Sequence, residues 1–202
     1  GLVATDWSAE WRDKEALAML EERAQAQYGS SYEALGDDDK ARLQTQLRPQ
    51  LRANTYDPAS DTIIISDERA RAIATVSAHY DSVFSDDPAS AHLRETYALR
   101  KNPIPDPEHR RLMAGFFFWA AWATVTERPD SKISYTHNFP HDPVVGNTPT
   151  ASSFMWSMFS ILLMIAGIAL LVWHYAAWHG KEPPLVPPAR DPSRGTVVTP
   201  SM

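Results

Sequence analysis

The sequence predicts a mainly α-helical domain followed by one membrane-spanning helix. Apolar side chains recur at helical spacing in several segments of the first 126 residues. Residues 154–178 then contain no Asp, Glu, Lys or Arg, and a helix of that length crosses the roughly 30 Å hydrocarbon core of a bilayer. Because this stretch comes late in the chain, it is not an amino-terminal signal peptide.

The first helix is expected to run to about Gln27, after capping side chains around Asp6. Trp7 and Trp11 are four residues apart and therefore share one face of this helix. Gly29 is expected to end it, because glycine adopts the left-handed conformation that commonly follows a helix.

A second helix is expected after the acidic run 37–39, since acidic side chains favour a helix N-terminus. Leu43, Leu47 and Leu51 recur every four residues and predict its buried face. Pro49 lies inside this segment and is expected to kink or shorten the helix.

The isoleucine run 63–65 is short and β-branched, and we expect an extended bridge there rather than part of a sheet. Ser66 then caps a helix that reaches about Phe84. A short helix is expected at 89–99, followed by a Pro-rich connector at 102–107.

Asp106 and Pro107 form a good N-cap and first-turn pair for a helix that runs to about Thr126. Pro, Asn, Asp and His dominate the segment between this helix and the apolar stretch. The predicted regions are a helical domain at 1–126, an external loop at 127–150, a transmembrane helix at 151–179 and a Pro-rich tail or linker at 180–202.

Composition excludes several function classes. The chain carries 25 acidic and 19 basic residues, a net charge of −6, which argues against a nucleic-acid binder. It has no cysteine, so it forms no disulfide, no thiolate metal site and no covalent haem attachment through C-x-x-C-H. Phosphate-binding, hydrolase and metalloprotease motifs are also absent, so no residue is assigned as catalytic.

Three groups of residues have alternative interpretations. The aromatic run 116–122 is either a buried or membrane-surface helix, or the wall of a cofactor pocket. His137 and His141 could share a metal ion in a loop, but Pro140 prevents helical spacing and plain loop polarity is favoured. His174 lies near the edge of the apolar stretch, where an interfacial residue is favoured over a haem ligand.

Several strings in collinear order resemble the amino-terminal region of quinol-dependent nitric oxide reductases. The resemblance covers almost the whole chain, and the order of the strings makes it specific. The strings are DWSAEW at 6–11, RANTYD at 52–57, FFFWAAW at 116–122, TERP at 126–129, YTHNFP at 135–140, VVGNTPT at 144–150 and WS at 156–157.

The resemblance implies an external domain with a degenerate cytochrome-c-like fold that has lost its haem, followed by a membrane helix. In this family, electrons from quinol pass through haem b to a haem and non-haem iron pair, which reduces NO to N2O. Those cofactors belong to a catalytic bundle absent from this sequence, so none is expected in this segment. Relative to the family, the chain also lacks the first membrane helix, and we expect it to be part of something longer or a split gene.

The expected partners are the lipid bilayer and that bundle, and the expected location is the bacterial inner membrane with residues 1–150 outside. Apolar side chains are expected to fill the former haem pocket, because an empty cavity is costly. The residues predicted to do so are Phe116, Phe117, Trp119 and Trp122. The residues predicted to contact the partner are Arg128, Tyr135, His137, Asn138 and Asn147. The alternative is a membrane-anchored interaction or sensor domain unrelated to catalysis.

Overall fold

The computed structural model describes residues 6–179, and its architecture is mainly α-helical, as predicted. The chain divides into two compact units, Gly1–Phe154 and Met155–Met202. The tail predicted at 180–202 lies outside the described residues.

Helix α1 (Trp7–Tyr28) begins and ends as its sequence predicts. The Asp6 carboxylate accepts hydrogen bonds from the backbone N–H groups of Ser8 and Ala9, which have no partner within the helix. Gly29 closes the helix at φ 63°, a left-handed conformation that a side chain would strain.

Helix α2 (Asp37–Arg52) follows the short 3-10 helix η1 (Tyr32–Ala34) and buries its three predicted leucines. Pro49 does not end it, because the helix continues to Arg52. A proline this close to the C-terminus removes one intrahelical hydrogen bond, whereas burial of Leu51 on the same turn holds the last residues in place.

The expected isolated bridge near the isoleucine run is wrong, because its first residue pairs in a small sheet. Strands β1 (Tyr56–Asp57) and β2 (Thr62–Ile63) are antiparallel, with Tyr56 opposite Ile63. The turn between them is closed by Asp57, which accepts from the Ala59 N–H, and by Asp61 at φ 52°.

The remaining helices of the first unit follow from their caps. Ser66 accepts from the Arg69 N–H at the start of α3, and Asp106 accepts from the Glu108 N–H at the start of α5. These elements are α3 (Asp67–Phe84), the 3-10 helix η2 (Pro88–Ser90), α4 (Ala91–Thr96) and α5 (Pro107–Val125).

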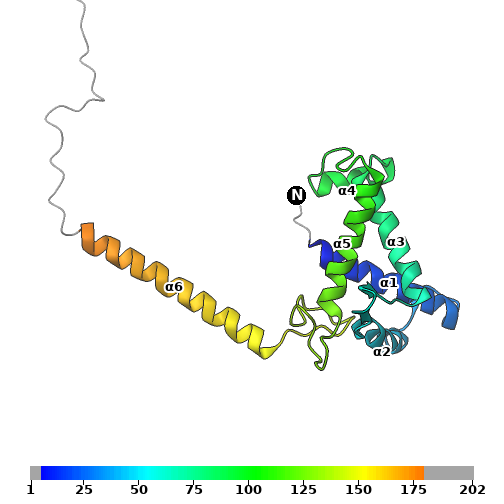
Figure 1. Ribbon diagram of the computed structural model, residues 1–202, viewed down its shortest axis with the longest axis horizontal. Helices are drawn as coiled ribbons and strands as arrows, with labels where there is room; N and C mark the ends of the chain where they lie inside the picture. The colour runs from blue at the N-terminus through cyan, green and yellow to red at the C-terminus, as the bar shows by residue number, and fades with distance from the viewer. Residues whose placement is uncertain (1–5, 180–202) are drawn as a thin grey trace, which may run out of the picture. The chain divides into compact units, whose positions relative to one another are not determined.

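Helix α1 packs against both α3 and α5, and these two helices also pack against each other. Figure 1 shows α1 crossing the pair, with α4 near the end of α3. One core cluster joins α1 to α2, with Leu20, Leu43 and Leu47 fully buried. A second, aromatic cluster joins α1, α3 and α5.

The segment 127–150 has little regular structure but contains two antiparallel bridges, Glu127 with Ser134 and Asp142 with Asn147. Helix α6 (Ala151–His179) follows it. Among the residues described, α6 is the one helix long and apolar enough to cross a membrane, and none of its residues is buried within the protein.

Candidate functional site

Aromatic rings from three helices fill the interior between α1, α3 and α5. Trp11 of α1 stacks on Tyr80 of α3 at 5.3 Å between ring centroids, and both side chains are fully buried. Trp7 meets Phe84 at 5.4 Å and Phe117 at 5.8 Å. Such contacts stabilise a core beyond simple area burial, by about 0.5–1.5 kcal/mol per pair.

Of the four aromatic residues predicted to fill the former haem pocket, two lie in the interior and two lie on the surface. Phe117 packs into the second cluster, and Trp122 is buried at 6% exposure. Phe116 and Trp119 are 59% and 55% exposed on the outer side of α5. The physical reason is helical geometry, since a helix turns only part of a continuous aromatic run towards one core.

A buried ion pair ties α1 to α3 beside this cluster. The Arg69 Nε donates to Glu15 Oε1 at 2.5 Å, and the two side chains are only 3% and 2% exposed. Trp11 Nε1 donates to the second oxygen of the same carboxylate at 3.2 Å. Burial raises the pKa of Glu15, and the Arg69 guanidinium opposes that shift.

Three arginines brace the segment 127–150 against the helices. Arg52, the last residue of α2, donates to Glu127 Oε1 at 2.9 Å, Asn147 Oδ1 at 3.1 Å and Asn138 Oδ1 at 3.3 Å. It also donates to the Lys132 carbonyl at 2.9 Å. A planar guanidinium has five N–H donors, so one arginine can bind all four of these acceptors.

The other two arginines hold the later part of the segment. Arg12 of α1 donates to Asp142 Oδ2 at 3.0 Å in a buried contact. Arg48 of α2 donates to the carbonyls of Pro143 at 2.7 Å and Val144 at 3.1 Å. The backbone polar groups of this loop are thus satisfied by the helical unit as well as by the loop itself.

The five residues predicted to contact a partner fall into two groups. Asn147 is fully buried and donates to the Thr124 carbonyl at 2.8 Å, and Asn138 accepts from the Ser134 N–H at 2.9 Å. These two amides point into the loop and shape it.

The other three lie together nearer the surface. Arg128 Nη2 donates to the Tyr135 carbonyl at 3.0 Å and lies 3.1 Å from Nδ1 of His137. The Tyr135 side chain is 41% exposed, and its ring stacks on Trp122 at 5.5 Å. Arg128, Tyr135 and His137 therefore form the outward part of the predicted set.

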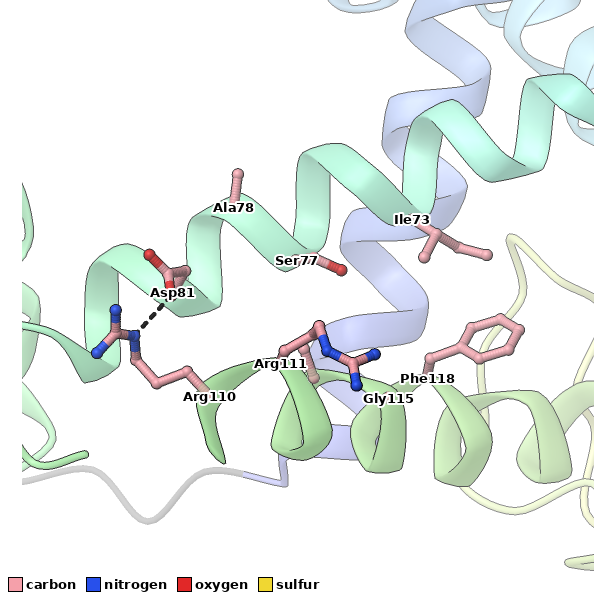
Figure 2. A pocket seen from close by; sticks show the side chains of 9 residues that line it. Ile73, Ser77, Ala78, Asp81, Arg110, Arg111, Gly115 and Phe118 are labelled. Atoms are coloured by element: carbon pink, nitrogen blue, oxygen red, sulfur yellow. Dashed lines mark hydrogen bonds and ion pairs between the residues drawn. The ribbon is translucent and has the colours of Figure 1, made fainter. Parts of the chain in front are cut away.

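A groove of about 420 Å³ lies between α3 and α5 (Figure 2). Ile73 and Phe118 lie towards one end, and the ion pair of Arg110 with Asp81, at 2.6 Å, lies at the other. Arg111 also lines the groove and pairs with Glu108. Both guanidinium groups are thus committed to carboxylates of the protein, which weakens the groove as an anion site.

A covalently attached haem does not fit these residues. The chain has no cysteine to form a thioether bond. The space between α1, α3 and α5 is occupied by stacked rings of the protein itself. Within residues 6–179, no three His, Asp or Glu side chains gather closely enough to hold a metal ion, and this includes His137, His141 and Asp142.

Sequence reasoning missed part of the arrangement. The four-residue spacing of Trp7 and Trp11 could have identified their shared role in the interior, but nothing near Tyr80 indicates its stack with Trp11. The roles of Arg12 and Arg52 carry no local signal, because their acceptors lie far away along the chain.

Comparison with protein families gives one finding for this chain. The family model for the NorB cytochrome c-like domain of nitric oxide reductase matches residues 1–141. The match takes in α1 to α5 and most of the braced loop, and it ends before α6. Comparison with curated proteins gave no match.

Proposed function

We propose that this chain, which belongs to the family of NorB cytochrome c-like domains of nitric oxide reductase, is a haem-free, non-catalytic module of that reductase. We further propose that the complete enzyme takes electrons from quinol and reduces NO to N2O. Its haem b and non-haem iron would belong to the catalytic part. In this account the chain supplies structure and a docking surface, and it carries no reacting group.

One observation carries the non-catalytic role. The interior that joins α1, α3 and α5 is packed with Trp7, Trp11, Tyr80 and Phe117. Protein interiors are close-packed, so a haem-sized ligand could enter only if several of these rings moved out. The absence of cysteine from the sequence supports the same conclusion.

We propose that the module sits on the external, periplasmic side of the bacterial inner membrane. The candidate span α6 supports attachment to a bilayer. Three Lys or Arg residues follow the span, whereas Arg128 and Lys132 are the nearest before it. Basic residues favour the cytoplasmic side, so this bias supports an outside-to-inside span.

We propose that the surface formed by Arg128, Tyr135 and His137 meets the external face of the catalytic bundle. Arginine and tyrosine are enriched at protein interfaces, because each combines a large contact area with hydrogen-bonding groups. The bracing by Arg52 would present this surface in a fixed shape, which lowers the entropy lost on docking.

The test compares membranes that carry this chain alone with membranes in which it is joined to the catalytic part of its reductase. Reduced quinol is supplied, and NO consumption and the haem b spectrum are recorded. We expect both signals only when the catalytic part is present. NO consumption by the chain alone would overturn the non-catalytic role, and no consumption by either sample would overturn the assignment to a quinol-driven reductase.

A further inference from the structure

A second groove, of about 480 Å³, gathers aromatic side chains around one carboxylate. Three segments build it: the β1–β2 hairpin, the outer face of α5 and the loop 127–150. Its lining residues are Tyr56, Asp61, Ile63, Trp119, Trp122, Ala123 and Tyr135.

Three of these rings are exposed to solvent. Tyr56, Trp119 and Tyr135 are 42%, 55% and 41% exposed, and Trp122 forms a buried base stacked on Tyr135. Single exposed apolar residues are common, but a cluster around a concave site marks a place where something binds. The Asn54 amide donates to the Tyr135 hydroxyl at 3.0 Å and fixes the position of that ring.

The electrostatics of the groove favour a positive charge. The faces of aromatic rings carry negative partial charge, and Asp61 adds a carboxylate. The Tyr56 hydroxyl donates to Asp61 Oδ1 at 2.8 Å, and within residues 6–179 no other hydrogen bond reaches that carboxylate. The nearby Arg128 guanidinium is directed to the Tyr135 carbonyl and His137.

The protein's own cations do not cover these rings. Within the described part of the chain, the two contacts between a cation and a ring face are Lys40 with Tyr32 and Arg69 with Phe118, and neither involves a residue of this groove. The rings are therefore open to a cation from outside.

We propose that this groove binds an organic cation, an alkylammonium or quaternary ammonium group, between the faces of Tyr56, Trp119 and Tyr135 and beside Asp61. Rings around a weakly hydrated cation are the usual recognition site for such groups. The cation can be a free small molecule or the headgroup of a lipid, since α6 is a candidate membrane span. This inference does not depend on the proposed function.

The experiment uses the full chain, labelled with 5-fluorotryptophan, in maltoside micelles that contain no ammonium group. The Trp119 fluorine resonance is identified among the seven tryptophans by its loss in Trp119→Leu. Choline and its uncharged isostere 3,3-dimethylbutan-1-ol are then titrated. We expect a saturable shift of the Trp119 resonance with choline, and binding of the neutral alcohol at least about fivefold weaker. No saturable shift with choline, or equal affinity for both probes, would overturn the proposal.

Two matched variants test the carboxylate. Asp61→Asn retains a residue that tolerates the positive φ of this position, so the hairpin should persist. We expect it to weaken choline binding by about threefold to fivefold and to leave the neutral alcohol unaffected. Asp38→Asn removes the same charge from an exposed position near the start of α2. It should change the binding of neither choline nor the neutral alcohol. Equal effects of the two variants on choline would contradict a local role for Asp61.

Nanodiscs distinguish the two sources of the cation. If the ligand is a lipid headgroup, the Trp119 resonance is already shifted in phosphatidylcholine discs, and added choline moves it no further. If the ligand is a free cation, choline titrates the resonance equally in phosphatidylcholine and phosphatidylglycerol discs. Failure of choline in micelles and in both kinds of disc would contradict both versions.

Discussion

Among the side-chain contacts of the helical unit, we expect the Glu15–Arg69 ion pair to matter most for its stability. Both side chains are almost fully buried, so removing one partner leaves an unpaired charge in the interior. We predict that Arg69→Met lowers the free energy of unfolding by about 3–5 kcal/mol. Urea unfolding of the full chain in micelles measures this.

The control for that prediction removes both charges at once. The double variant Arg69→Met/Glu15→Leu places apolar groups of similar size at both positions, and it should recover most of the loss. A single variant that costs less than about 1 kcal/mol would show that the pair is not desolvated as described.

The pair of Glu68 with Arg23 should make stability depend on pH. The bidentate contact, at 2.5 and 2.9 Å, holds the pKa of Glu68 below its ordinary value of 4.5, against the opposing effect of partial burial. The stabilisation is therefore present above pH 4.5 and is lost as the pH falls through the lowered pKa. We predict that Glu68→Gln costs about 0.5–1 kcal/mol at pH 7 and much less at about pH 3, as measured by urea unfolding.

Glu22→Gln is the matched control, because Glu22 makes the same kind of contact with Arg71 at an exposed site. Its side chain is 40% exposed, compared with 22% for Glu68, so water screens the pair more strongly. We expect Glu22→Gln to leave the free energy of unfolding almost unchanged at both pH values. Identical pH profiles for the two variants would contradict the assignment to Glu68.

At the scale of elements, Arg52 should decide whether the loop 127–150 is ordered. Its guanidinium bonds two side-chain amides, a carboxylate and backbone carbonyls of that loop. We predict that Arg52→Gln lowers amide-exchange protection in the loop by about tenfold or more, while α1 and α3 keep theirs. Arg52→Lys should not rescue it, since an ammonium cannot reproduce the planar fork.

Arg48→Gln is the comparison variant on the same helix, because Arg48 bonds two loop carbonyls and no carboxylate. Its effect on exchange should be smaller and confined to residues near Val144. Equal loss of protection in the two variants would mean that Arg52 is not the main anchor.

Local chemistry predicts the helical elements better than it predicts the site. Capping by Asp6, Ser66 and Asp106 acts within a few residues, and the corresponding helix starts are confirmed. Helix α2 continues for three residues past Pro49. The prediction for the isoleucine run is wrong, because pairing with a neighbouring strand outweighs local preference. The ordered conformation of the loop could not be predicted from the sequence, because Arg12 and Arg52 form their hydrogen bonds with it only after the chain has folded.

For the whole molecule, the orientation across the membrane is a separate prediction. The sequence has no cysteine, so single cysteines can be placed without background. In spheroplasts, a membrane-impermeant maleimide should label Asp130→Cys, which lies at an exposed loop position, and should label Ser193→Cys only after lysis. The opposite pattern would place residues 1–150 in the cytoplasm.

The most direct test of the central claim is the absorption spectrum of the full chain, purified from haem-replete cells and then titrated with haemin. A haem-free module whose interior is filled by Trp11, Tyr80 and their neighbours should show no Soret band, and haemin should produce no saturable spectral change. A stoichiometric haem spectrum, either as purified or after titration, would contradict the claim, because the aromatic interior would then have opened to admit the ligand.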